Sequence, residues 1–183
     1  MNGLNSILVL AVAFLAVFLE ASFDGVRNLL GAQIDLLPAL MVYTSLSLQL
    51  PTIISLAVLG GLGFDSLSAN PLGISILPLL VPGFLIYVRR ELILREQFYA
   101  QLVLGLLASG ASPIIALLML SCTRQAPVLG WSSVWQWLVM TLGGGILTPV
   151  CFRLFDGLSH ALIYRPVVES SFRMDRDIKR GRN

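Results

Sequence analysis

Three polar side chains near the end of the last apolar segment share one helix face. Arg153, Asp156 and His160 follow one another at intervals of three and four residues, the spacing that brings side chains together on a helix. Such a set can form a local ion pair, contact a partner protein or take part in acid–base chemistry. His160 is the only histidine, and helical spacing places no serine or cysteine nucleophile beside it. We therefore expect no catalytic site, metal site or cofactor, and keep the ion pair and the partner contact as alternatives.

A carboxylate also interrupts the apolar stretch "GLGFDSLSANPLGIS", residues 61–75. Asp65 is followed there by Asn70-Pro71 and by Gly73. The simplest interpretation is a helix–loop–helix hairpin in which Asn70 caps the second helix, Pro71 takes its first position and Gly73 relieves crowding. We expect the Asp65 carboxylate to accept hydrogen bonds from neighbouring serines or from backbone groups of the turn. The alternative is a ligand, ion or partner site, because carboxylates inside membranes often mark one.

Basic residues gather in one loop and in the tail. The loop holds Arg89, Arg90 and Arg95, and is interpreted as a solvated helix end or as a docking surface for a cytoplasmic protein. The tail set is Arg173, Arg176, Lys179, Arg180 and Arg182. These residues favour adhesion to an anionic membrane surface, where each adds about 1 kcal/mol, or contact with a protein partner. No aromatic or groove-reading element accompanies them, so we expect no nucleic-acid binding.

The composition indicates whether the chain that carries these polar groups is surrounded by water or by lipid. Hydrophobic residues make up 56% of the 183 residues, charged residues only 12%, and the mean hydropathy is +0.85. An ordinary soluble domain carries roughly 25% charged residues. A chain with half that share is expected to be an integral membrane protein, since the lipid-facing surface needs no charge.

The apolar segments predict an all-α bundle of about six transmembrane helices, each of about 20 residues. The expected spans are residues 4–23, 36–50, 51–67, 71–88, 98–122 and 134–164. Residues 1–164 would form this transmembrane domain, and residues 165–183 a basic cytoplasmic tail. Of the lysines and arginines in the predicted loops, nine fall on one side and two on the other. The positive-inside rule then places both termini in the cytoplasm.

Several residues inside these spans predict how the helices pack. Three glycines of the third span, Gly60, Gly61 and Gly63, would let a neighbouring helix approach closely. Pro78 and Pro82 make the fourth span irregular, which is typical of a kinked packing helix or of a helix that lines a small-ligand cavity.

Two predictions concern the outer ends of the spans. Asp35 is expected to cap the second helix at its N-terminus. Trp131, Trp135 and Trp137 cluster at the outer end of the last span, where they fit an interfacial aromatic belt.

The hairpin sequence "GLGFDSLSANPLGISILPLL", residues 61–80, resembles the D-x-x-S-G-x-P-L-G hairpin of the bacterial rod shape-determining MreD family. The upstream stretch "IDLLPALMVYTSL", residues 34–46, is similar to the second span of that family. The match departs at Ala69, where the family usually has glycine. The resemblance covers residues 34 to about 80, and the six-span length fits over the rest.

The resemblance implies a non-enzymatic scaffold subunit of the cell-elongation machinery, which directs peptidoglycan synthesis at the bacterial inner membrane. The implied fold is that of the six-helix substrate-binding subunits of energy-coupling-factor transporters. The implied partners are membrane lipid, MreC, the actin-like MreB, and the RodA glycosyltransferase with its partner transpeptidase. No catalytic residues carry over, because the family has none established.

A substrate-binding membrane subunit of a vitamin-type transporter is the alternative. Such subunits typically dock through an Ala-x-x-x-Ala pattern in the first helix. The alanines of the first predicted span never fall four residues apart, which disfavours this alternative.

Overall fold

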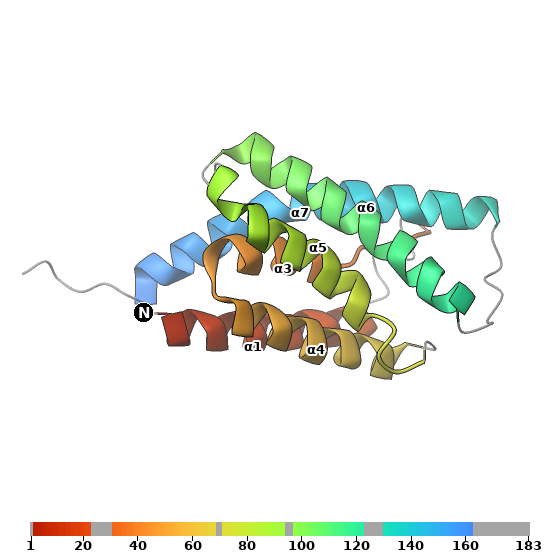
Figure 1. Cartoon of the computed structure of the whole chain (residues 1–183), viewed down its shortest axis with the longest axis horizontal. Helices are drawn as coiled ribbons and strands as arrows, with labels where there is room; N and C mark the ends of the chain where they lie inside the picture. Colours follow the sequence, from red (N-terminus) through yellow and green to blue (C-terminus); the bar gives the residue numbers. More distant parts are fainter. Residues whose placement is uncertain (1, 23–30, 69–70, 94–96, 123–129, 163–183) are drawn as a thin grey trace, which may run out of the picture.

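Six α-helices account for the apolar segments among the residues that the structure describes (Figure 1). The computed structural model describes residues 2–22, 31–68, 71–93, 97–122 and 130–162. The helices are α1 (Asn2–Ser22), α3 (Leu37–Ser47), α4 (Leu50–Leu67), α5 (Ile76–Arg89), α6 (Phe98–Cys122) and α7 (Trp131–Leu162), with a 3-10 turn, η1 (Arg90–Leu92). The described residues contain no strand, so the all-α prediction is confirmed for them. The bounds of α6 are those predicted, whereas α5 begins five residues later than expected.

Hydrogen bonds between helix ends show that successive helices run in opposite directions. The Glu20 carboxylate, near the end of α1, accepts the Leu36 N–H just before α3 at 2.5 Å. At the opposite end of the molecule, the Ser6 and Thr52 hydroxyls join the starts of α1 and α4 at 2.9 Å. The chain therefore passes back and forth along one axis, as Figure 1 shows. This is the arrangement expected of a multi-pass bundle.

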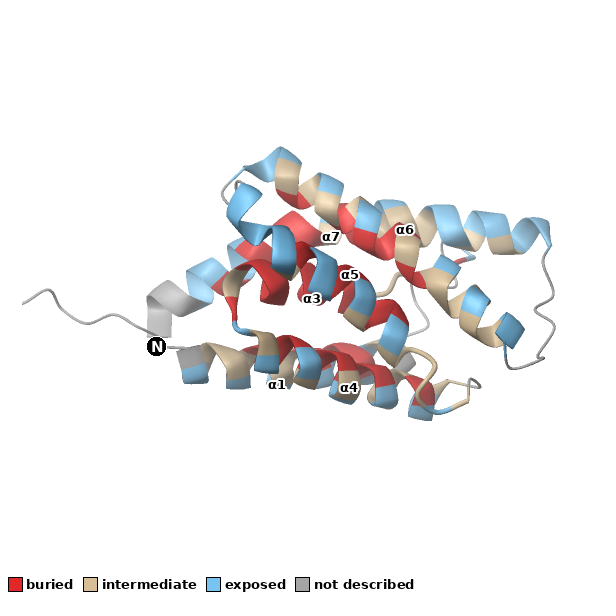
Figure 2. Ribbon diagram, viewed as in Figure 1, coloured by how far each residue is buried: buried red, intermediate tan, exposed pale blue. Residues whose placement is uncertain are grey.

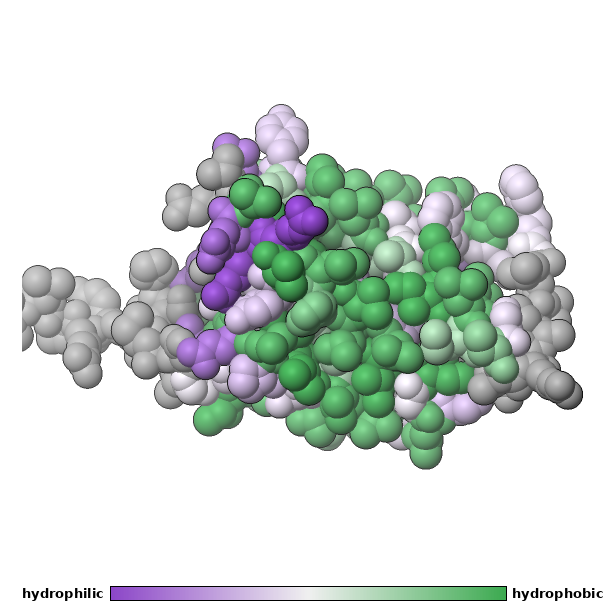
Figure 3. All heavy atoms as spheres, viewed as in Figure 1, coloured by the Kyte–Doolittle hydropathy of each residue, from purple (hydrophilic) through white to green (hydrophobic). Residues whose placement is uncertain are grey.

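Among the described residues, three buried or partly buried acids lie at one end of this bundle, and all three arginines lie at the other, together with the exposed acids Glu91 and Asp156. We call one the acidic end, because Glu20, Asp35 and Asp65 all lie where α1 and α4 finish and α3 and α5 begin. The basic end, where α5 and α7 finish, carries the three arginines that the structure describes, Arg89, Arg90 and Arg153. In Figure 3 the hydrophilic side chains gather beside the junction of α5 and α6.

Three helices are long and apolar enough to cross a membrane. They are α4, α6 and the Trp131–Leu158 part of α7. With 25 residues, α6 extends for about 37 Å, more than the roughly 30 Å of a hydrocarbon core. Large apolar side chains such as Phe14 (77% exposed) and Leu107 (63% exposed) point outward, and apolar surface covers most of the visible face in Figure 3. These features fit a multi-pass membrane protein.

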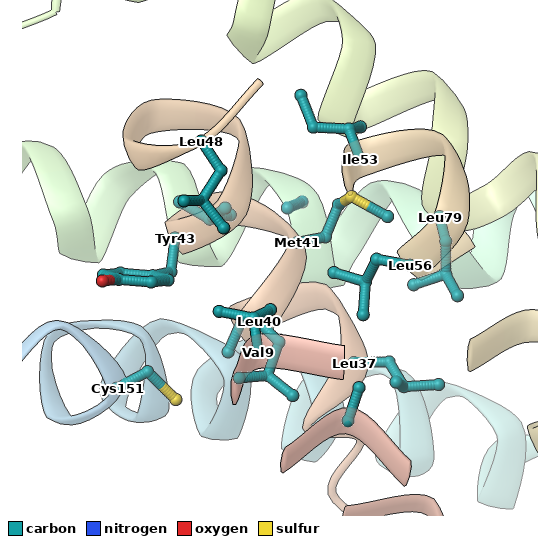
Figure 4. Close-up of a cluster of buried hydrophobic side chains, with 14 of the residues drawn as sticks. Val9, Leu37, Leu40, Met41, Tyr43, Leu48, Ile53, Leu56, Leu79 and Cys151 are labelled. Atoms are coloured by element: carbon teal, nitrogen blue, oxygen red, sulfur yellow. The ribbon is translucent and has the colours of Figure 1, made fainter. Parts of the chain in front are cut away.

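The short helix α3 forms the centre of the fold. All of its residues except Ser47 are buried, and it contacts each of the other five α-helices. Figure 2 shows it as a buried segment, and Figure 4 shows its side chains among those of its neighbours. A helix surrounded on every side by protein needs no polar face.

The predicted second span, residues 36–50, is too long for this helix. At 11 residues, α3 extends for only about 16 Å. The residues that flank this short helix are not helical, and such backbone can lie at membrane depth only where protein covers it. The five helices around α3 supply that cover. Thr44 and Ser45 donate their hydroxyls to the carbonyls of Leu40 and Met41, at 2.7 Å each, so these buried polar groups are satisfied within the helix.

Glycines bring the outer helices close to one another. A methyl group at Gly61 would lie 2.9 Å from the Ile76 backbone nitrogen, and one at Gly60 would lie 3.1 Å from the Leu37 side chain. The predicted close approach of a helix backbone is therefore confirmed at Gly61, whereas Gly60 meets a side chain and a methyl group at Gly63 would lie at an ordinary 3.6 Å from Val17. Between α6 and α7, a methyl group at Gly144 would overlap the Ser109 side chain, so small residues also set the separation of these two helices.

Candidate functional site

The Asp65 carboxylate holds the α4–α5 turn together at the acidic end. Asp65 is only 1% exposed. Its Oδ2 accepts the N–H groups of Gly73 (2.8 Å) and Ser75 (3.1 Å), and its Oδ1 accepts the Ser75 hydroxyl. Gly73 has a φ of +93°, a backbone conformation that residues with a Cβ rarely adopt. The carboxylate thus accepts hydrogen bonds from three donors of the turn, two backbone N–H groups and one hydroxyl, as buried polar groups require.

This geometry corrects the prediction for the start of α5. Pro71 lies in a turn before the helix, and Ser75 is the N-cap residue, whereas Asn70 lies outside the described residues. The helix cannot begin earlier, because the Asp65 side chain takes the N–H groups of Gly73 and Ser75 and the left-handed Gly73 breaks the helical path. The sequence identified Asp65 and Gly73 as turn residues, but not their direct contact.

The predicted partners of Asp65 were right in kind and partly wrong in detail. Backbone N–H groups of the turn do bond to the carboxylate, as expected. The Ser66 hydroxyl instead donates to the Gly63 carbonyl. The Ser68 N–H donates to the backbone carbonyl of Asp65, and a bond from the Ser68 side chain to the carboxylate stays a prediction. Ser75, ten residues from Asp65, was missed. No local pattern identifies a partner at that separation, because the turn that closes it is formed only in three dimensions.

Two more carboxylates lie beside each other where α1 meets α3. The Asp35 Oδ1 accepts the Leu37 N–H at 2.9 Å, next to the Glu20 carboxylate that accepts the Leu36 N–H. The N-cap residue of α3 is Leu36 rather than Asp35, so the predicted cap is one residue out of place, although the carboxylate does bond to the first turn. Burial raises the pKa of Asp35 to about 6, because a low-dielectric environment disfavours the charged form.

The segment before α3 is also tied to α7 at the acidic end. The Gln136 side chain accepts the Gln33 N–H at 3.2 Å and donates to the Gln33 carbonyl at 3.1 Å. The next residue along α7 is Trp137, whose indole N–H donates to the Gly110 carbonyl of α6 at 3.0 Å. Trp137, which is 37% exposed, is thus bonded to α6, whereas Trp131 is 87% exposed. The aromatic belt stays a prediction.

A cavity of about 840 Å³ opens at the acidic end, where the second half of α6 and the first half of α7 diverge. The starts of α3 and α5 form its remaining walls. Its described lining includes Asp35, Leu37, Phe64, Ser75, Pro78, Leu79, Ser112, Pro113, Ile114, Ala116, Leu117, Leu120, Val134, Gln136, Trp137 and Met140. Asp35 is the single ionisable side chain among the lining residues that the structure describes. We refer to this space as the acidic-end cavity.

A proline links the irregular helix α5 to the wall of this cavity. Pro82 lacks an N–H, so the Pro78 carbonyl, one turn earlier, has no intrahelical donor. The Ser112 hydroxyl of α6 lies 3.1 Å from that carbonyl and 2.9 Å from the Ala108 carbonyl. Pro78 and Leu79 line the cavity. The predicted irregularity of this span thus lies where a cavity is found, with a serine from another helix compensating the freed carbonyl.

At the basic end, the predicted polar face of α7 is only partly described. Arg153 and Asp156 are both exposed, whereas nothing of the His160 side chain is described. The Arg153 guanidinium lies 6.0 Å from the centre of the Phe98 ring, a cation–π distance. Opposite this face, Phe152 and Phe155 are buried against Tyr43 of α3, with ring centres 5.0 and 4.6 Å away.

The basic loop lies at the same end. Arg89 and Arg90 are exposed. Arg90 lies over the Tyr87 ring at 4.4 Å and donates to the carbonyl of Leu48, the C-cap residue of α3, at 3.3 Å. Arg95 and the tail residues Arg173, Arg176, Lys179, Arg180 and Arg182 fall outside the described residues. The structure thus brings Arg89 and Arg90 to the end of the bundle that carries Arg153, far along the helices from Asp65.

Comparison of the chain with protein-family models, curated proteins and solved structures finds no match. In the described residues, no three histidine, cysteine, aspartate or glutamate side chains lie close enough to hold a metal ion. The functional interpretation therefore depends on the acidic end, the basic end and the cavity themselves.

Proposed function

We propose that this chain is a membrane scaffold subunit of the bacterial cell-elongation machinery, of the MreD kind, which acts by contacting other membrane proteins. Six membrane-crossing passes in the bacterial inner membrane, with both termini in the cytoplasm, are part of this proposal. The partners would be MreC and, with it, MreB, RodA and the partner transpeptidase of RodA. The subunit itself would carry out no reaction.

One observation carries the proposal most directly. The residues that resemble the MreD hairpin include Asp65 and Gly73, and these two residues bond directly to each other at 2.8 Å. The eight-residue separation between them therefore has a physical cause in this chain, because the carboxylate needs a left-handed glycine to turn its N–H inward. A stretch that resembled the hairpin by hydrophobicity alone would not require that pair.

The exposed surface suits a protein that works through contacts. Outward-facing apolar side chains run along α1 and α6, with Phe14 and Phe18 on the first and Leu107 and Leu118 on the second. In a bilayer such faces meet lipid or partner helices, whose association is driven by packing and a few polar contacts worth about 0.5–2 kcal/mol each. The exposed arginines of the basic end would lie in the cytoplasm, where MreB is found.

Co-purification tests the proposal. The tagged chain would be produced, together with MreC, in a rod-shaped bacterium whose own MreD is depleted. We expect MreC to be recovered with the chain in detergent and the cells to stay rod-shaped. An Asp65→Ala variant at equal abundance should lose both. Rounded cells, together with a purified chain that lacks MreC, would contradict the proposal.

The acidic-end cavity favours a second candidate, a substrate-binding subunit of a small-molecule transporter. Its volume of about 840 Å³ falls within the range of about 300–1,000 Å³ that ligand sites occupy. The same purification separates the two candidates. Recovery of coupling ATPases with a bound small molecule, in place of MreC, would favour the transporter.

A further inference from the structure

We propose that the acidic-end cavity binds an amphipathic molecule whose apolar body fills the space between α6 and α7 and whose protonated amine pairs with Asp35. This inference does not depend on the scaffold role, since a ligand can bind whether or not MreC does. It assigns a binding site and a ligand class: one positive charge on an apolar body.

The apolar part of the ligand follows from the walls. The second half of α6 contributes Pro113, Ile114, Ala116, Leu117 and Leu120, all of which line the cavity. Met140 and Val134 face them from α7. Walls of this kind favour hydrocarbon or aromatic groups, each buried Å² of apolar surface contributing about 25 cal/mol. A strongly polar molecule, such as a sugar, would leave its hydroxyl groups without partners there.

Most polar groups of the cavity are already used by the fold. The Gln136 amide bonds in both directions to Gln33, and the Trp137 N–H bonds to Gly110. The hydroxyls of Ser112 and Ser75 donate to a carbonyl of the bundle and to Asp65, respectively. These groups hold the walls in place. Besides these groups, the described lining offers the hydroxyls of Ser132 and Ser133, which is a small capacity for a ligand with many hydrogen-bonding groups.

The charge of the cavity selects the polar group of the ligand. Asp35 is the ionisable residue among the described lining, and the Glu20 carboxylate stands beside it, across the adjacent Leu36 and Leu37 N–H groups. The described arginines all lie at the basic end. A carboxylate that is partly removed from water gains most from a cation that it can contact directly. An ammonium group meets that need, and an anionic group would be repelled.

Native mass spectrometry of the full chain in neutral detergent tests the proposal with three probes of equal length. These are decylamine, decanol and decanoate, which carry a positive charge, no charge and a negative charge. We expect one saturable decylamine adduct, bound at least about tenfold more tightly than decanol, a difference of about 1.4 kcal/mol. Decanoate should bind more weakly than decanol.

Two substitutions separate the parts of the site. Asp35→Asn keeps a side-chain oxygen for the Leu37 N–H and removes the charge, so the preference for decylamine over decanol should fall to near onefold. Ala116→Trp fills the cavity and should abolish both adducts. Leu118→Trp is its matched control, because Leu118 lies two residues away on the same helix and is 60% exposed. This control should bind like the original chain.

A parallel measurement identifies the source of the amine. The chain would be reconstituted in nanodiscs of phosphatidylethanolamine or of phosphatidylglycerol and then analysed in the same way. A retained phosphatidylethanolamine that decylamine displaces, and that Ala116→Trp loses, would identify a membrane lipid as the ligand. Decylamine binding without any retained lipid would identify a soluble amphipathic amine. Equal binding of decylamine and decanol, or adducts unchanged by Asp35→Asn and Ala116→Trp, would overturn the proposal.

Discussion

The two ends of the bundle hold their charged side chains in opposite ways. At the acidic end, Asp65 is almost fully buried and accepts three hydrogen bonds from the following turn. At the basic end, Arg90 is exposed. Its guanidinium lies over the Tyr87 ring and donates a hydrogen bond to the Leu48 carbonyl. One charge is thus part of the internal structure, whereas the other lies on its surface.

The difference shows what each end contributes. A buried carboxylate with several donors fixes the path of the chain, since leaving any of those donors unsatisfied is costly. An exposed arginine contributes little to stability, but a group of them sets the orientation in the membrane and remains accessible to a partner or an anionic lipid. The buried hydrogen bonds that fix the path of the chain therefore lie at the acidic end. The exposed arginines expected to influence membrane orientation lie at the basic end.

The largest expected effect is an all-or-none difference in thiol labelling between the ends. Leu72 and Leu92 lie in turns at the acidic and basic ends, and are 71% and 78% exposed. In a chain whose two natural cysteines are replaced by serine, a membrane-impermeant maleimide applied to intact cells should label Leu72→Cys but not Leu92→Cys. Both should react after lysis. The reverse pattern would refute the predicted orientation.

Removal of the Asp65 carboxylate should have the largest effect on stability. Asp65→Ala leaves two N–H groups and one hydroxyl of the α4–α5 turn without an acceptor, and should lower the free energy of unfolding by about 3 kcal/mol. Thermal unfolding followed by tryptophan fluorescence in nanodiscs measures the change. The neighbouring Ser66→Ala, whose hydroxyl bond is exposed, should cost only a few tenths of a kcal/mol. Similar costs for both would contradict the structural role of Asp65.

The Asp35 carboxyl should make stability depend on pH. Its pKa is raised from the ordinary 3.8 to about 6, so the folded chain binds the proton more tightly than the unfolded chain does. Stability from the protonated form is complete below about pH 4 and is lost as the pH rises through 6. Asp35→Asn should therefore be more stable than the original chain at pH 7.5, by about 1–2 kcal/mol for this half-buried group, and equal to it near pH 4.

Unfolding curves at both pH values measure the Asp35 effect. A variant in which the exposed acid Glu91, at the basic end, is replaced by glutamine is the control for the loss of one negative charge. The Glu20 carboxylate stands beside Asp35, so the gain in Asp35→Asn includes the removed repulsion between the two carboxyl groups. A difference between Asp35→Asn and the original chain that is the same at both pH values would show that the charge of Asp35 is not its cause.

A smaller loss is expected where α6 compensates for a proline of α5. Ser112→Ala removes the hydroxyl that reaches the Pro78 carbonyl, and should cost about 1 kcal/mol. Ser121→Ala is the matched control on the same helix, because the Ser121 hydroxyl bonds only to an exposed carbonyl within its own helix. Equal melting temperatures for the two variants would show that the Pro78 carbonyl does not need this donor.

The smallest effect is expected at the basic end. Arg90→Ala removes the contact with Tyr87 and the bond to Leu48, and should cost about 0.5 kcal/mol. Arg89→Ala provides the adjacent control. A loss from Arg90→Ala as large as that from Asp65→Ala would remove the proposed contrast between the two ends.

Much of the helical framework could be predicted from local patterns. The bounds of α6 match the expected span, and α4 begins one residue earlier than expected, because uninterrupted apolar runs end at polar or proline-containing turns. The start of α5 could not be predicted in the same way. Pro71 is a typical first residue of a helix, but hydrogen bonds from a turn to Asp65 keep it outside.

Less of the candidate site than of the helical framework could be predicted from the sequence. Asp65 and Gly73 were identified by type and position, and Pro78 by the irregularity it causes. A small-ligand cavity beside Pro78 and Pro82 was one of two alternatives, but the Gln33–Gln136 pair was missed, because residues 103 positions apart leave no periodic signal in one sequence. Asp35 was expected to act only as a helix cap, and its place on the cavity wall depends on where α6 and α7 diverge.

The sequence by itself determined the apolar character of the chain, the approximate helices and the separation of basic from other loops, since these follow from residue type and short-range periodicity. The tertiary structure alone decided that the short α3 lies at the centre, that Asp65 bonds to Gly73 and Ser75, and that a cavity opens beside Asp35. The physical reason is that burial and hydrogen-bond satisfaction depend on which distant segments meet, and one-dimensional patterns do not contain that information.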